Sequence, residues 1–122
     1  MTDPNLVILY VRDVATALAF WSPLLGREPV ERADTFAMVP LNAATMLGLW
    51  KVGGVEPAAT LTGGGTEIAV AVASRDAVDA AHTDWSVAGR AILQPPTDMD
   101  FGRTFTAADP DGHRVRVYCP AE

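Results

Sequence analysis

The chain has 122 residues, of which 49% are hydrophobic and 20% charged, so it can bury a core and is not expected to be disordered. Its formal net charge of −6 argues against a general nucleic-acid-binding protein, which needs a basic surface to meet phosphates. The single cysteine, Cys119, excludes an intramolecular disulfide and favours a reducing compartment, so we expect a cytoplasmic protein.

The first half of the chain predicts one strand, one helix and three further short strands. The uninterrupted apolar run 6–11 is typical of a buried strand. Asp13 is placed to cap a helix whose apolar residues recur at helical spacing as far as Gly26, and Pro23 predicts an irregular last turn. The three further strands are expected at 30–32, 36–39 and 46–52.

The second half repeats this order after a glycine-rich connection at 53–65. Its elements are expected as a strand at 66–73, a helix between the cap Ser74 and Gly89, a short strand at 91–93 that stops before Pro95, and a closing hairpin at 101–118. An offset of 61 residues aligns the first strand and the cap Asp13 with the later strand and Ser74, which indicates an internal repeat.

The closing hairpin turns at the segment 109–112, where Asp, Pro, Asp and Gly occupy the positions that a tight turn favours. After the turn the chain alternates between a charged or aromatic set and an apolar set. The first set is Arg114, Arg116 and Tyr118, and the second is Val115, Val117 and Cys119. We expect the second set to face a core and the first to face something polar.

These patterns predict an α+β fold built from two tandem βαβββ modules within a single domain, 1–122. The modules are expected at 1–52 and 66–122, with 53–65 as a linker. A module with one helix covers only one face of its curved mixed sheet, so the other face needs a cover. Pairing of modules, within a chain or in a homodimer, would supply that cover and leave a cleft for a small ligand.

Two segments resemble a known family. The segments 10–26 and 101–113 are similar to the first helix region and the closing hairpin of the vicinal oxygen chelate superfamily. That superfamily includes glyoxalase I, extradiol dioxygenases, fosfomycin-resistance transferases and bleomycin-resistance proteins. The resemblance supports the predicted fold, but this fold hosts both enzymes and binding proteins.

The resemblance also implies where metal ligands would lie. Metal-dependent members carry a His at the start of a module's first strand and a Glu near the end of its last strand. This chain has Leu6 and Glu67 at the two His positions and Arg116 at the closing Glu position. His82 and His113 fall on no ligand position. An apolar group and a cation do not bind a divalent metal, so we expect no metal and no cofactor.

Strand alternation and the resemblance give most of a set of candidate ligand-binding residues, and Phe101 and Arg103 join it because they open the last hairpin, in a loop placed to close over the cleft. The set is Tyr10, Phe36, Met38, Trp50, Glu67, Phe101, Arg103, Arg116 and Tyr118. Other roles stay open for several of them: Trp50 as a core or dimer-contact residue, Phe36 and Met38 as core residues, and Glu67 with Arg116 as a structural salt bridge. Cys119 has no His partner expected nearby and is interpreted as inert.

The resulting hypothesis is a metal-free, homodimeric binding protein similar to the bleomycin-resistance type. It would sequester an aromatic or multi-ring organic ligand, such as an antibiotic, without making or breaking a bond. The alternative is a lyase, isomerase or dioxygenase, either metal-dependent with unusual ligands or using Glu67 as a general base. No signal peptide or bilayer-length apolar run is evident, so a membrane is not expected as a partner. A nucleic acid is not expected either, because the net charge is −6.

Overall fold

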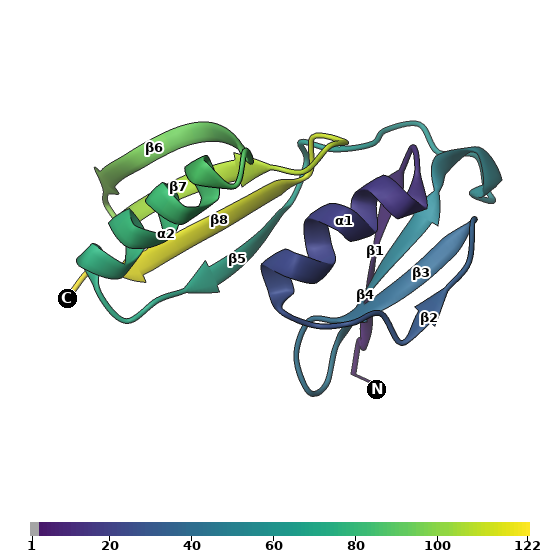
Figure 1. Cartoon of the computed structure of the whole chain (residues 1–122), viewed down its shortest axis with the longest axis horizontal. Coiled ribbons are helices and arrows are strands. Elements are labelled where there is room, and N and C mark those ends of the chain that lie inside the picture. The colour runs from purple at the N-terminus through teal and green to yellow at the C-terminus, as the bar shows by residue number, and fades with distance from the viewer. Residues whose placement is uncertain (1–2) are drawn as a thin grey trace. The chain divides into compact units, whose positions relative to one another are not determined.

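The computed structural model describes residues 3–122 and divides the chain into two compact units, Met1–Gly63 and Gly64–Glu122. Each unit is a strand, a helix and three further strands, with the helix packed on one face of a four-stranded mixed sheet (Figure 1). The predicted α+β fold of two tandem modules is therefore confirmed. Neither of the two helices in residues 3–122 combines the length and apolar character needed to span a bilayer.

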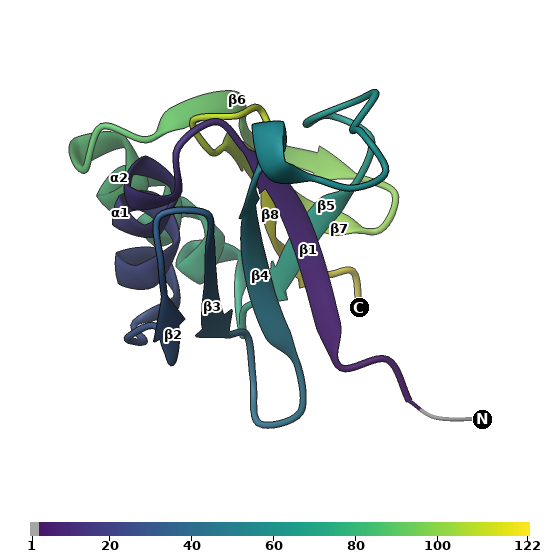
Figure 2. The same ribbon diagram turned by 90° about the vertical axis from the view of Figure 1, so that its right-hand side faces the viewer.

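The first unit has the strand order β1-β4-β3-β2, which Figure 2 shows side by side. Its elements are β1 (Leu6–Val11), α1 (Val14–Leu25), β2 (Glu31–Arg32), β3 (Phe36–Pro40), β4 (Met46–Lys51) and the 3-10 turn η1 (Val52–Gly54). β1 runs parallel to β4, and β3 pairs antiparallel with β4. The strand predicted at 46–52 therefore ends one residue early, because Val52 begins the 3-10 turn.

The core of the first unit lies between α1 and its sheet. Trp21 is fully buried at the centre of the helix face that meets the sheet, as its place on the apolar helical stripe predicts. Leu9, Leu47 and Leu49 are the buried leucines that the strands contribute to this core. Pro23 does not disrupt the helix, which continues to Leu25 and ends at a left-handed glycine.

The second unit has the order β5-β8-β7-β6. Its elements are β5 (Glu67–Ala71), α2 (Arg75–Val87), β6 (Ala91–Met99), β7 (Gly102–Ala108) and β8 (Arg114–Pro120). Val78 from α2, Phe105 from β7 and Val117 from β8 form its buried core. Trp85 packs edge-on against Phe105, with 5.1 Å between the ring centroids.

The strand predicted at 91–93 is wrong in extent, since β6 continues through Pro95 and Pro96 to Met99. Proline ends a central strand because it lacks an amide N–H, but β6 is an outer strand and pairs only with β7. The pairing register shifts between Ile92 and Gln94 and again between Gln94 and Thr97. The prolines lie in the second irregular stretch, where the ladder needs no donor from them.

The internal repeat is visible in the helix starts. Asp13 accepts a hydrogen bond from the Thr16 amide at 2.9 Å, and Ser74 accepts one from the Ala77 amide at 3.0 Å. Both caps and both first bonded residues are 61 positions apart. The two modules therefore begin their helices with the same local chemistry, an Asp or Ser oxygen that satisfies an otherwise unpaired amide.

Candidate functional site

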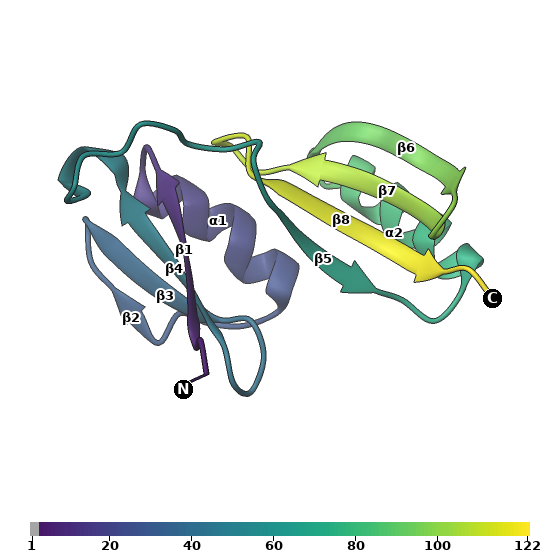
Figure 3. The ribbon, with the colours of Figure 1, turned by 180° about the vertical axis from the view of Figure 1, so that it is seen from behind.

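The second sheet has one face covered by α2 and one face without a helix, seen in Figure 3. Val115 and Val117 are buried on the α2 side, so Arg116 and Tyr118, which alternate with them, lie on the other side. We call this helix-free side the open face of the second sheet. The alternation predicted for the last strand is confirmed.

Arg116 binds Glu67 through a paired ion contact on this open face. Its Nε donates to one carboxylate oxygen of Glu67 at 2.6 Å, and its Nη2 donates to the other at 2.9 Å. The Arg116 side chain is 19% exposed and that of Glu67 is 31% exposed, so solvent screens this pair less than an ordinary surface pair. Two parallel N–H bonds to one carboxylate also fix the orientation of both groups.

Three further polar residues form a hydrogen-bond network with Arg116, and they are not among the candidates predicted from the sequence. Arg116 Nη1 donates to Gln94 Oε1 and to Thr104 Oγ1, both at 3.2 Å. The Thr106 hydroxyl also donates to Gln94 Oε1, at 3.3 Å. Thr104 and Thr106 share the face of Arg116 by strand alternation, which is a signal that the sequence contained. Gln94 was missed because its strand was expected to end at residue 93.

The ion pair shifts the protonation of both partners in opposite directions. Hydrogen bonds from Arg116 lower the pKa of Glu67 below its usual 4.5, and partial desolvation opposes this only in part. The same bonds from Glu67 raise the pKa of Arg116. Glu67 is therefore ionised at neutral pH and is a weaker base than an unpaired glutamate.

An aromatic pair lies beside the ion pair on the open face. The Phe101 ring meets the Tyr118 ring edge-on at 6.3 Å, and the guanidinium carbon of Arg116 lies 5.7 Å from the Phe101 centroid. Phe101 is 45% exposed, which is high for a phenylalanine in contact with its own sheet. The backbone of Phe101 is fixed by a 2.8 Å hydrogen bond from the Ala121 amide to its carbonyl.

The first sheet carries a second aromatic group on the face away from α1. Trp50 contacts Tyr10 and Phe36 edge-on, with ring centroids 6.3 and 6.5 Å away. All three rings are half-buried, and Met38 follows Phe36 on the same face by alternation. Gly48 lies beneath the Phe36 ring, because a Cβ there would come within 3.0 Å of Phe36 Cζ. We call this side the open face of the first sheet.

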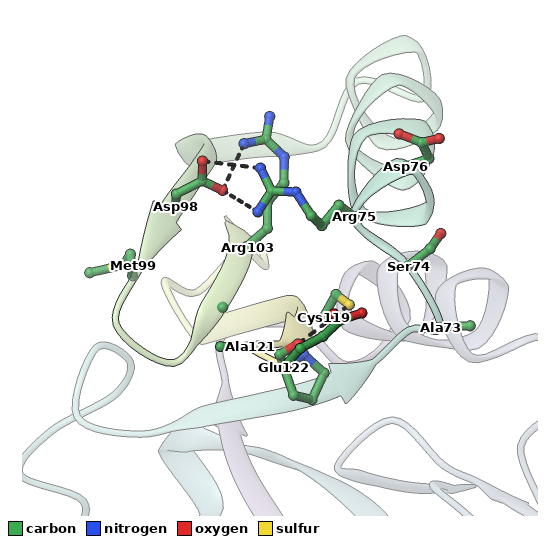
Figure 4. Close-up of a pocket in the computed structure, with 12 residues that line it drawn as sticks. Ala73, Ser74, Arg75, Asp76, Asp98, Met99, Arg103, Cys119, Ala121 and Glu122 are labelled. Atoms are coloured by element: carbon green, nitrogen blue, oxygen red, sulfur yellow. Dashed lines mark hydrogen bonds and ion pairs between the residues drawn. The ribbon is translucent and has the colours of Figure 1, made fainter.

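The structure does not bring Arg103 together with the other candidates. Arg103 alternates with Thr104, so it lies on the α2 side, where its Nε donates to Asp79 at 2.8 Å. Asp98 lies between the guanidinium groups of Arg103 and Arg75, with contacts of 3.1 and 2.7 Å (Figure 4). Arg75, Asp98 and Arg103 line a pocket of about 630 Å³, and Cys119 lines it as well.

The eight remaining candidates thus fall on two open faces, one in each unit. Tyr10, Phe36, Met38 and Trp50 lie on the first, and Glu67, Phe101, Arg116 and Tyr118 on the second. The first group is mostly apolar and aromatic, whereas the second combines a satisfied ion pair with two aromatic rings.

The residues at the expected metal positions do not fit a divalent cation. Leu6 offers no donor atom, and Arg116 presents a cation whose N–H groups already engage both oxygens of Glu67. Among residues 3–122, no group of three or more His, Cys, Asp or Glu side chains is arranged to hold a metal ion.

Comparisons with known proteins give matches that extend over nearly the whole chain. Residues 4–117 match the Glyoxalase/Bleomycin resistance protein/Dioxygenase superfamily. The chain is 32% identical over 123 residues to the phenazine antibiotic resistance protein EhpR of Enterobacter agglomerans, covering 98% of this chain and 92% of that protein.

Solved structures show the same fold. A protein of Agrobacterium tumefaciens solved by NMR in solution is 47% identical, with a TM-score of 0.87 and full coverage of both chains. A glyoxalase/bleomycin resistance protein/dioxygenase from Nocardioides is 22% identical, with a TM-score of 0.85 over 100% of this chain and 85% of that one. At this lower identity the likeness extends to the fold alone.

Proposed function

This chain belongs to the Glyoxalase/Bleomycin resistance protein/Dioxygenase superfamily, and from that premise we propose that it is a binding protein that sequesters a flat, multi-ring aromatic molecule without metal and without chemical turnover. The observation that carries the proposal is the closed polar network around Arg116. The guanidinium of Arg116 is paired to Glu67, Gln94 and Thr104, and the sequence resemblance assigns Arg116 to the position at which metal-dependent members carry a carboxylate ligand.

The aromatic residues on the open faces support a flat ligand. Phe101 exposes 45% of its surface beside Tyr118, and Trp50 holds Tyr10 and Phe36 around it in edge-on contacts. Aromatic side chains bind planar rings by stacking and edge contacts, with little loss of side-chain entropy. The similarity to a phenazine antibiotic resistance protein supports the same ligand class, since phenazine is a flat tricyclic ring.

The enzyme alternative that uses Glu67 as a general base has less support. A base is most effective when its pKa lies near the working pH, whereas the bonds from Arg116 lower the pKa of Glu67. Both carboxylate oxygens also already accept a hydrogen bond. The pair therefore supports orientation of a ligand better than proton abstraction.

The proposal includes a homodimer, whose contacts would cover the exposed sheet faces, and a cytoplasmic site of action. Leu6 and Ile8, which lie on the open face of the first sheet, are 38% and 39% exposed, which leaves apolar surface for such a contact. Sedimentation velocity at several protein concentrations tests this part separately. A monomer at all concentrations overturns the dimer and leaves the binding proposal standing.

Titration calorimetry with phenazine tests the binding function, and chromatography of the recovered phenazine tests the absence of turnover. We expect stoichiometric binding, unchanged phenazine, and the same affinity before and after dialysis against a chelator. Trp50→Leu should weaken binding, whereas Trp85→Leu, a change in the α2 packing, should lower stability and leave affinity near the wild-type value. Conversion of the probe, or a stoichiometric metal ion required for binding, contradicts the proposal.

A further inference from the structure

The geometry points to a restriction on the ligand: the open face of the second sheet selects aromatic molecules whose polar edge donates a hydrogen bond, and it rejects those whose edge is a carboxylate. This inference rests on the proposed binding function and names its ligand class more narrowly. It reverses the usual expectation for an arginine in a binding site, which is to bind an anion.

The first step is the state of Arg116. Its guanidinium has five N–H groups, and four hydrogen bonds to neighbours are present: two to Glu67, one to Gln94 and one to Thr104. The two bonds to Glu67 use the paired edge with which arginine normally grips a carboxylate. A ligand carboxylate would therefore have to displace Glu67, which is itself ionised.

The second step is that the neighbours of Arg116 are also satisfied. Gln94 Oε1 accepts from Arg116 and from Thr106, so both of its lone pairs have donors. The Thr104 hydroxyl accepts from Arg116 and donates to the Val117 carbonyl at 2.9 Å. Rotating Arg116 toward a ligand would leave the buried Thr104 hydroxyl oxygen without its donor and would leave Gln94 Oε1 with the Thr106 hydroxyl alone, which is unfavourable.

The third step is what Glu67 still presents. A carboxylate has about four acceptor sites, and Arg116 uses two of them. Because the Glu67 side chain is 31% exposed, the remaining sites can be reached from outside. Arg114 is a second cation on this face, at the register position beside Glu67; because solvent screens it, its attraction lowers the pKa of Glu67 less than the bonds from Arg116 do. The polar group offered to a ligand is thus an acceptor, next to the Phe101 and Tyr118 rings.

Three probes that share the phenazine ring and differ only at position 2 test this inference. They are 2-aminophenazine, phenazine and phenazine-2-carboxylate, and each is titrated into the wild-type protein at neutral pH. We expect 2-aminophenazine to bind about tenfold more tightly than phenazine, as one hydrogen bond to a charged acceptor allows, and the carboxylate to bind more weakly than phenazine. Glu67→Gln should reduce the preference for the amine over the carboxylate. Arg114→Met, the matched removal of a cation that makes no bond to Glu67, should leave the order unchanged.

A separate readout follows the Arg116 side chain itself. The Nε–H signal of Arg116 in ¹⁵N NMR spectra should shift no further with saturating phenazine-2-carboxylate than with phenazine, because the bond to Glu67 persists with both and only the ligand ring affects the signal. Tightest binding of the carboxylate, equal binding of the three probes, or a larger shift of that signal with the carboxylate than with phenazine overturns the inference while leaving the binding function intact. Failure of all three probes to bind overturns both.

Discussion

Gly102 lies directly against the backbone of Cys119: a Cβ on Gly102 would come within 2.0 Å of the Cys119 carbonyl oxygen. The backbone of Gly102 also has φ of +139°, which residues other than glycine rarely adopt. Phe101 is the residue before Gly102. The close approach of Gly102 to Cys119 therefore fixes the backbone that holds the exposed Phe101 ring at the open face of the second sheet.

The first prediction is that Gly102→Ala lowers the free energy of unfolding by about 3 kcal/mol or more, because strain at φ adds to a backbone clash. Gly112→Ala is the matched control. Gly112 also has positive φ, at +83°, but a Cβ there would meet nothing within 4 Å, so its expected loss is about 1 kcal/mol. Urea denaturation followed by circular dichroism measures both. Equal losses in the two variants would contradict the role of the Cys119 contact.

The second prediction concerns pH. Since the folded-state pKa of Glu67 lies below its usual 4.5, the ion pair with Arg116 stabilises the fold fully above that pH. This contribution is lost as the pH falls through the lowered pKa. Wild-type stability should therefore decrease more steeply below pH 4.5 than that of Glu67→Gln, and the two curves should run parallel above pH 6. The stability of Arg116→Met should show the same weaker dependence on pH below 4.5. If both variants lose stability as steeply as the wild type, the ion pair is not the cause of the wild-type pH dependence.

The third prediction tests the helix start of the second unit. Ser74→Ala removes the acceptor of the Ala77 amide and should lower stability by about 1 kcal/mol. Ser74→Asp introduces the residue that caps the equivalent helix at Asp13, and it should retain most of the wild-type stability. Thermal unfolding of the three proteins provides the comparison. Ser74→Asp as unstable as Ser74→Ala would show that the repeated cap chemistry is not interchangeable.

The fourth prediction concerns the open face of the first sheet. Gly48→Ala places a Cβ 3.0 Å from Phe36 Cζ and 3.3 Å from Ile8 Cγ1, so the Phe36 ring has to shift and its contact with Trp50 changes. We expect a stability loss of about 1–2 kcal/mol together with a changed tryptophan emission spectrum and weaker phenazine binding. Gly54→Ala, whose Cβ would meet Trp50 Nε1 at an ordinary 3.8 Å, should leave emission and binding close to wild type.

Local patterns in the sequence were sufficient to predict the module order, both helix caps and the closing turn. Each of these depends on residues close together in the chain: Asp13 with Thr16, Ser74 with Ala77, and Asp109, whose carbonyl accepts from the Gly112 amide at 3.1 Å. The face of Arg116 was also predictable, since alternation within one regular strand needs no knowledge of its neighbours.

Features that depend on pairing between strands were not predicted. Gln94 reaches Arg116 only because β6 continues past its prolines, and that follows from its place at the edge of the sheet. Arg103 was grouped with Phe101 because the two are near in sequence. Its alternation with Thr104 directs it to the α2 side, where Asp79 and Asp98 hold it.

The prolines of β6 have a consequence for the protein in solution. An outer strand with a regular row of unpaired N–H and C=O groups is a template on which another chain can add a strand. Pro95 and Pro96 supply no N–H, and the register shifts around them interrupt the row on the same strand that carries the exposed Leu93. This edge of the second sheet is therefore protected against aggregation by strand addition.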